Sequence, residues 1–300
     1  MNQSRAERRL PPPALRSMIF SPGNRLDMVA KGAASGADAV IIDLEDAVPA
    51  AAKEEARRNL RNLPPSGVPW YVRVNGAETE HLWDDVVAAA TGDVAGIVLP
   101  KAGDPQLLAQ LDGALTALEL RAGIARGSIE LIPLIESAAG ILSARDMCES
   151  TSRVRTVLFG GGEQGDLVTD LGCEWTPDGT ALLTARSQVL LAARASGVQP
   201  MDAVFMDFRN PGALRAECQL ARRIGYVGKV AIHPSQLPVI HEVFTPTVDE
   251  VAAQRRILEL FGKAVASGSA SISVDGRMVD YAVAARARSI LARAEAVGAR

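Results

Sequence analysis

The segment 156–172, TVLFGGGEQGDLVTDLG, combines three consecutive glycines with the carboxylates of Glu163, Asp166 and Asp170. Glycines between an apolar strand and a helix are typical of a phosphate-binding turn. Carboxylates at the same place repel a phosphate and attract a cation. The segment alone therefore leaves two hypotheses open, an anion site and a metal site.

Glu136 and Asp166 lie at the ends of two successive predicted strands, the fifth and the sixth, and their oxygens suit a hard cation. Mg²⁺ commonly takes one or two protein carboxylates and completes its octahedron with water and substrate oxygens. The three histidines, His81, His233 and His241, do not pair at ligand spacing, which disfavours a zinc or iron site. Acidic residues at strand ends also cap helices, so this pair alone does not decide between the hypotheses.

Two cations stand in similar positions. Lys101 ends a predicted strand in LPKA, where an amine can form a Schiff base, but we favour an ion pair with Asp43 or Glu45. Arg73 lies in VRVNG, near the end of another strand. An arginine that points into a barrel costs desolvation energy unless it binds an anion or a carbonyl oxygen. Arg73 is therefore the most suggestive cation in the chain.

Short apolar segments rich in Val and Ile predict the elements that position these residues. Eight of them read as strands: 16–20, 38–46, 70–75, 96–102, 129–137, 156–161, 202–208 and 228–234. The segments between them, such as 105–123 and 181–197, show helical spacing and end at glycine. This alternation predicts a (β/α)8 TIM barrel, with a doubly wound open sheet as the alternative. Because chemistry in such a barrel lies at the carboxyl ends of the strands, one rim would collect most of the unusual polar residues.

The predicted organisation has three parts. Residues 1–15 form a polar, proline-containing tail that we expect to be disordered, and residues 16–243 form the barrel catalytic domain. Residues 244–300 form a C-terminal helical extension, with a capped helix over 244–268 and a hairpin-like turn and a helix over 271–298. We expect this extension to pack on a neighbouring subunit, and a helical lid is the alternative.

Composition excludes several classes of protein. The net charge of −3 disfavours nucleic-acid binding, which usually needs a basic surface. The three cysteines, Cys148, Cys173 and Cys218, form neither a zinc motif nor a disulfide framework. No apolar run approaches the ~18 residues of a membrane span, and no hydrophobic segment follows the charged N-terminus. We therefore expect a cytoplasmic protein that binds neither nucleic acid nor membranes.

Eight motifs occur in order along the chain: RSMIFSPGNR, DAVIIDLEDAV, VRVNG, IVLPK, LIESAAGI, DLVTDLG, GKVAIHPSQ and DGRMVDYAV. This ordered set resembles the citrate lyase β-subunit-like family of the 2-oxo-acid aldolase/citrate lyase superfamily, which includes malyl-CoA lyase and citramalyl-CoA lyase. The resemblance covers nearly the whole chain. It implies a Mg²⁺-dependent barrel that assembles as a homotrimer or hexamer. It also implies cleavage or formation of a 3-hydroxyacyl-CoA, such as citramalyl-CoA or malyl-CoA, with an acyl-CoA and a 2-oxo acid as the other partners.

The same resemblance implies the metal ligands, Glu136 and Asp166. The family's loop after the sixth strand commonly reads Phe-Gly-x-x-Asp, whereas GGGEQG separates Phe159 from Asp166 here. The extra residues leave Glu163 as the alternative ligand. We favour Asp166, because DLVTDLG matches the family without gaps.

Further roles also follow from the resemblance. Arg73 and Asp280 match catalytic positions, and Asp280 is the aspartate that a neighbouring subunit delivers. The matching substrate-binding positions are Phe20, Arg25, Lys31, Arg73, Ile232 and His233. Two alternative functions remain on the same scaffold: an acyl-CoA thioesterase, and the β subunit of a citrate-lyase-type complex that acts on an acyl-carrier-protein thioester.

Overall fold

The computed structural model describes residues 14–298, and the chain divides into two compact units after His241. The predicted tail, residues 1–15, lies outside the described residues except for Ala14 and Leu15. Leu15 is buried in the barrel core.

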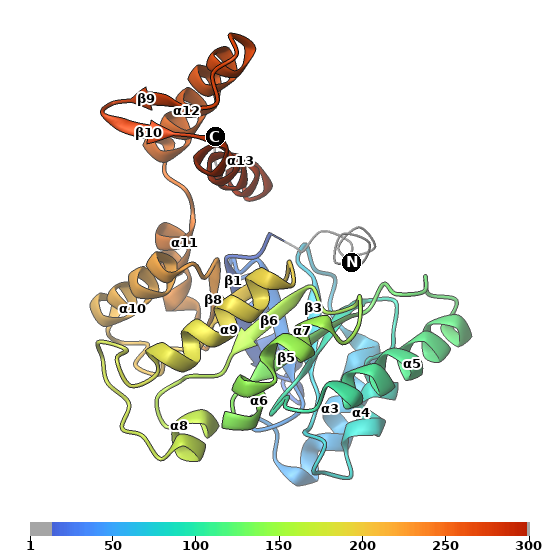
Figure 1. Cartoon of the computed structure of the whole chain (residues 1–300). Coiled ribbons are helices and arrows are strands. Elements are labelled where there is room, and N and C mark those ends of the chain that lie inside the picture. Colours follow the sequence, from blue (N-terminus) through green and yellow to red (C-terminus); the bar gives the residue numbers. More distant parts are fainter. Residues whose placement is uncertain (1–13, 299–300) are drawn as a thin grey trace. The chain divides into compact units, whose positions relative to one another are not determined.

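The first unit is a closed barrel of parallel strands, hydrogen-bonded in the order β1 to β8 and surrounded by helices (Figure 1). The predicted (β/α)8 fold is therefore confirmed, and the open sheet is excluded. The strands are β1 Ser17–Pro22, β2 Ala39–Asp43, β3 Trp70–Arg73, β4 Val94–Leu99, β5 Glu130–Ile135, β6 Thr156–Phe159, β7 Gln199–Asp202 and β8 Gly228–Ala231.

The connecting helices are α2 Leu26–Ala33, α3 Lys53–Asn59, α4 Leu82–Ala89, α5 Pro105–Ala122, α6 Ala138–Leu142, α7 Ala144–Glu149, α8 Asp166–Leu171, α9 Leu183–Ala195, α10 Pro211–Ile224 and α11 Leu237–Phe244. Short 3₁₀ turns are η1 Ala50–Ala52, η2 Leu60–Asn62 and η3 Pro234–Gln236. The bounds of α5 follow from its sequence. Asp104 accepts the backbone N–H of Gln106, and Gly123 ends the helix in the left-handed conformation.

Both faces of the strands are buried, which explains their continuous apolar sequences. Alternate residues, including Met18, Ile41 and Val98, fill the barrel interior. Their neighbours, such as Val40 and Ile42, are also buried, on the opposite face of the strand. The scaffold that carries the strand ends is therefore densely packed.

Strand β7 begins earlier than predicted. The run DAVFMDF favoured a strand over 202–208, but β7 ends at Asp202. Pairing with β6 stops at Leu158 and Met201, and Asp202 is bound to Lys229 of β8 at 2.7 Å. Asp207, which falls within the predicted strand 202–208, therefore lies in the loop after β7.

The second unit has its own small core. It contains α12 Val248–Ala266, a hairpin of β9 Ile272–Val274 and β10 Arg277–Val279, and α13 Tyr281–Ala296. Phe261, Val274, Val279 and Ala284 pack together in this unit. Over residues 14–298, no helix combines the length and the apolar character that a membrane crossing requires.

Gly96 of β4 provides a test of the packing. A Cβ at this position would lie 2.8 Å from the Tyr71 ring and 2.9 Å from Cβ of Glu130. We expect Gly96→Ala to lower the free energy of unfolding by about 1–3 kcal/mol, because the barrel interior has no room for the methyl group. A Cβ at Gly113 of α5 would have no atom within 4 Å. Gly113→Ala should therefore raise the free energy of unfolding by about 0.5–1 kcal/mol. Thermal unfolding of both variants checks the opposite signs, and a Gly96→Ala protein as stable as the wild type would contradict the packing.

Candidate active site

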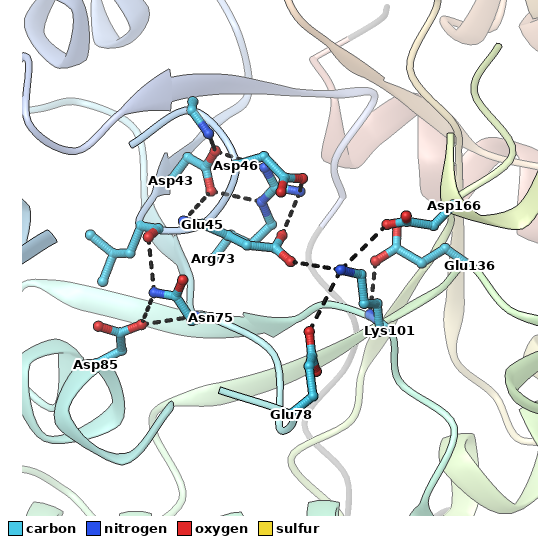
Figure 2. A network of polar contacts seen from close by, with 12 residues as sticks. Asp43, Glu45, Asp46, Arg73, Asn75, Glu78, Asp85, Lys101, Glu136 and Asp166 are labelled. Carbon is cyan, nitrogen blue, oxygen red and sulfur yellow. Dashed lines mark hydrogen bonds and ion pairs between the residues drawn. The ribbon is translucent and has the colours of Figure 1, made fainter. Parts of the chain in front are cut away.

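Arg73, the last residue of β3, is bound by carboxylates at the end of β2 (Figure 2). Its Nε and Nη2 atoms donate to the two oxygens of Asp43, both at 2.7 Å. Its Nη1 atom lies 2.9 Å from Glu45 and 3.4 Å from Asp46. The Phe20 ring lies 4.7 Å from the guanidinium carbon, a cation–π contact. The arginine is therefore held in one orientation.

Asp43 also shapes the loop that carries these carboxylates. Its two oxygens accept the backbone N–H groups of Glu45 and Ala47, both at 2.9 Å. Aspartate at the end of a strand often forms such local bonds and so starts a turn. The side chain that clamps Arg73 thus also places Glu45 beside it.

Glu45 is almost fully buried, which makes its charged form costly. Burial, together with the neighbouring carboxylates of Asp46, Glu136 and Asp43, raises the pKa of Glu45 to about 8, although Arg73 opposes the shift.

Lys101 stands between the carboxylates of both sides of the site (Figure 2). Its Nζ atom lies 3.7 Å from Glu45, 3.6 Å from Glu78 and 3.7 Å from Asp166. The sequence favoured an ion pair of Lys101 with Asp43 or Glu45, and the structure places Glu45 beside the ammonium. Burial lowers the pKa of the lysine, but these carboxylates outweigh it, and the net shift is upward.

Glu136 follows β5 and is fixed from two directions. Its Oε1 atom accepts the backbone N–H of Lys101 at 2.8 Å, and Lys101 adopts the left-handed conformation there, with φ of 49°. On the other side, a Cβ at Gly160 would lie 2.4 Å from Cβ of Glu136. The first glycine of the 160–162 run is therefore needed for this close approach.

Glu136 and Asp166 form a carboxylate pair at the mouth of the barrel (Figure 2). Burial chiefly, with the charge of Asp166, raises the pKa of Glu136 to about 7, although the Lys101 N–H and Arg73 oppose the shift. Asp166 is the first residue of α8 and is half exposed. A buried carboxylate next to a solvent-facing one is a donor set that fits Mg²⁺, since water and substrate oxygens commonly complete its coordination. Within residues 14–298, no three His, Cys, Asp or Glu side chains gather as a fuller metal cage.

A second hydrogen-bond network, which the sequence did not predict, contacts the loop after β2 through the carbonyl of Leu44. The backbone N–H and the side-chain amide of Asn75 donate to Asp85 at 2.8 and 2.6 Å, and the amide also donates to the carbonyl of Leu44. Arg57 binds the other oxygen of Asp85 at 2.9 Å. The available signal was an acidic residue on the buried face of α4, three residues after Leu82.

The other predicted site residues lie in the segments that follow β1 and β8. Arg25 is exposed and paired with Asp27 at 2.9 Å, and Lys31 lies on the next turn of α2. The backbone N–H of Ile232 donates to Gln236, and the His233 ring stacks on Phe208 with centroids 4.6 Å apart.

Asp280 belongs to the second unit, where it caps α13. Its Oδ1 atom accepts the backbone N–H groups of Ala282 and Val283, both at 3.0 Å. This capping role uses one of its two carboxylate oxygens.

These observations define a class of protein, the (β/α)8 barrels with a charged site at the carboxyl ends of the strands. Within that class, the chain belongs to the HpcH/HpaI aldolase/citrate lyase family, whose model matches residues 16–234. A second family model, for a carbon–carbon bond lyase of the TIM-barrel fold, matches residues 185–299. The family resemblance read from the motifs is thereby confirmed.

Curated relatives match almost the full chain. A citrate lyase subunit beta-like protein of Deinococcus radiodurans is 37% identical and covers 94% of this chain and 98% of its own length. The citrate lyase subunit beta of Escherichia coli is 34% identical, with 95% of each chain covered. A (3S)-malyl-CoA thioesterase of Cereibacter sphaeroides is 35% identical and covers 95% of this chain and 96% of its own. Together they support a CoA-related lyase family.

Solved structures agree with this assignment. CitE of Mycobacterium tuberculosis, crystallised with magnesium, acetoacetate and coenzyme A, superposes with a TM-score of 0.75 at 31% identity. That match covers 95% of this chain and 98% of the solved one. A citrate lyase beta subunit from the same organism, complexed with oxaloacetate and magnesium, has a TM-score of 0.63 at 31% identity and covers 77% and 97% of the two chains.

The raised pKa of Glu45 has a measurable effect on stability. The pKa of Glu45 is raised to about 8 in the native protein, whereas that of an unfolded glutamate is ~4.3. Between these values the native state binds more protons, so this group lowers the free energy of unfolding as the pH rises. Glu45→Gln imitates the neutral carboxyl and removes this loss.

We therefore expect Glu45→Gln and the wild type to have similar stability at pH ~5, and the variant to be more stable at pH ~9 by about 1–3 kcal/mol. Thermal unfolding in EDTA across this pH range checks the divergence. A stability difference that does not change with pH would show that Glu45 is ionised throughout.

Proposed function

We propose that this protein is a Mg²⁺-dependent carbon–carbon lyase that cleaves or forms a 3-hydroxyacyl-CoA of the citramalyl-CoA or malyl-CoA type. The products of cleavage are an acyl-CoA and a 2-oxo acid. The observation that carries the proposal is the Glu136–Asp166 carboxylate pair facing a clamped arginine at the carboxyl ends of the strands. The names of the relatives and the magnesium of CitE support it.

Glu136 and Asp166 are the proposed ligands. Asp166 is preferred to Glu163 for two reasons. Its charge raises the pKa of Glu136, and its carboxylate lies beside the ammonium of Lys101, whose backbone N–H donates to Glu136. The bound Mg²⁺ supplies a Lewis acid for the oxygens of the 2-oxo-acid half.

Arg73 stabilises negative charge on the acyl-CoA half. Asp43 occupies its Nε–Nη2 edge, so the Nη1 atom, shared with Glu45 and Asp46, is the part that an enolate oxygen can reach. A pre-oriented cation in a water-poor site stabilises developing charge without reorganisation. Phe20, beneath the guanidinium, would line the thioester, and Arg25 and Lys31 would meet the CoA phosphates.

Asp280 is the proposed general acid and base at the acyl carbon. Its Oδ2 atom is free of the two N–H groups that cap α13, so it can carry the proton. We infer that residues 244–300 pack on a neighbouring subunit of a homotrimer or hexamer, so that Asp280 completes the site of the barrel, residues 16–243, in the next chain. Ile232 and His233 would contact the substrate, and the cytoplasm is the proposed location.

A thioesterase is the second candidate, because a relative of 35% identity carries that name. The third is the β subunit of a citrate-lyase-type complex that acts on an acyl-carrier-protein thioester, as the names of other relatives suggest. The three functions differ in what they release from a CoA ester.

Incubation with malyl-CoA and citramalyl-CoA in the presence of Mg²⁺ tests the proposal. We expect release of a 2-oxo acid and an acyl-CoA in equal amounts, with free thiol below both. Glu136→Gln should lower kcat/KM by about a hundredfold or more, because it removes a charged ligand. Arg73→Lys should cost about 10²–10³ in kcat, because a lysine cannot reproduce the fixed guanidinium.

Asp280→Asn tests the catalytic role proposed for the C-terminal unit. Asparagine keeps the cap of α13, so the thermal midpoint should stay near that of the wild type while activity is lost. Free CoA without a 2-oxo acid would identify the thioesterase. Silence on CoA esters, with activity restored by an acyl-carrier-protein thioester and partner subunits, would identify the complex.

A further inference from the structure

The ammonium group of Lys101 lies close to three carboxylates at the mouth of the barrel. Lys101 Nζ lies 3.7 Å from Glu45, 3.6 Å from Glu78 and 3.7 Å from Asp166 (Figure 2). All three exceed hydrogen-bond distance, so they are Coulombic contacts without fixed direction. The side chain is more than one-third exposed, and its four-carbon stem is flexible. Moving this ammonium therefore breaks no directional bond to these carboxylates.

The charges around Lys101 are unbalanced. Even with Glu45 protonated, the two cations Arg73 and Lys101 face five further acidic side chains: Asp43, Asp46, Glu78, Glu136 and Asp166. Arg73 is engaged by the three carboxylates at the end of β2. Lys101 is thus the cation that the structure places beside Asp166.

The two halves of Lys101 act on the two proposed ligands. Its backbone N–H fixes Glu136 at 2.8 Å, while its ammonium faces Asp166 at 3.7 Å. We propose that Lys101 is a resident counter-ion, which balances these carboxylates in the metal-free protein and competes with the divalent cation for them. The inference rests on the proposed function, because it takes Glu136 and Asp166 as the ligands.

A cation bound by Asp166 would lie close to the ammonium and be repelled by it. Lys101 would then have to move toward Glu45 and Glu78, or out to solvent, before the metal binds. Metal affinity is accordingly lower than the carboxylates alone would give. The opposite hypothesis is that Lys101 only positions the ligands, in which case removing its charge would weaken metal binding.

Titration with Mn²⁺ distinguishes these hypotheses. The electron paramagnetic resonance signal of the free ion measures how much Mn²⁺ remains unbound. Lys101→Met keeps the backbone N–H and the stem and removes the charge, so we expect it to bind Mn²⁺ about tenfold more tightly than the wild type. Lys101→Arg keeps the charge and should bind as the wild type does. Lys263→Met removes the same charge from an exposed ion pair with Glu259 and should also leave the affinity unchanged.

Thermal unfolding supplies a second readout. In EDTA we expect Lys101→Met to melt below the wild type, because its carboxylates have lost their counter-ion, and to gain more than the wild type on addition of Mg²⁺. Lys101→Gln serves as a second variant and should behave alike.

The outcomes separate this inference from the proposed function. Equal or weaker Mn²⁺ binding by Lys101→Met, with binding abolished by Glu136→Gln, would overturn only the role of Lys101. Absence of Mn²⁺ binding by the wild type, or binding that survives Glu136→Gln, would overturn the proposed metal site and this inference together.

Discussion

Both oxygens of Asp43 accept hydrogen bonds from Arg73, and the same carboxylate accepts the backbone N–H groups that shape the following loop. Asp43 is only 1% exposed, so neither charge can be left alone without a large desolvation cost. This pair ties the end of β2 to the end of β3. It also holds the guanidinium against Phe20, where its remaining N–H groups can face a ligand.

The acidic residues around the Asp43–Arg73 pair are consistent with the proposed ligands of the site. The proposed site would bind a divalent cation and an anionic thioester, which requires negative and positive groups within a few ångströms of one another. The barrel places Arg73 at the end of β3, Lys101 just after β4 and Glu136 just after β5. Burial raises the pKa of Glu136 to about 7, so a cation would be needed to keep it ionised near neutral pH. Gly160 allows this carboxylate to take its position, because a side chain at 160 would clash with Glu136.

Much of this arrangement could be predicted from local patterns. Strand composition predicted the barrel, and the polar residues at strand ends predicted the rim that holds Arg73, Lys101 and Glu136. The end of β7 could not be predicted, because pairing with β6 and the Lys229 ion pair, rather than hydropathy, determine it. Glu78 was missed because it lies in a loop without strand or helix periodicity, and Asp85 because its partner Asn75 comes from another element. Such contacts depend on tertiary structure.

The central claim is that Glu136 and Asp166 bind the metal that activates a 2-oxo acid. A crystal structure of the protein grown with Mg²⁺ and pyruvate or glyoxylate tests it most directly. We expect density for one octahedral ion, with oxygens of Glu136, Asp166 and the oxo acid at about 2.1 Å and water in the remaining positions. An ion bound through Glu163 instead, or an oxo acid bound away from Glu136 and Arg73, would contradict the account.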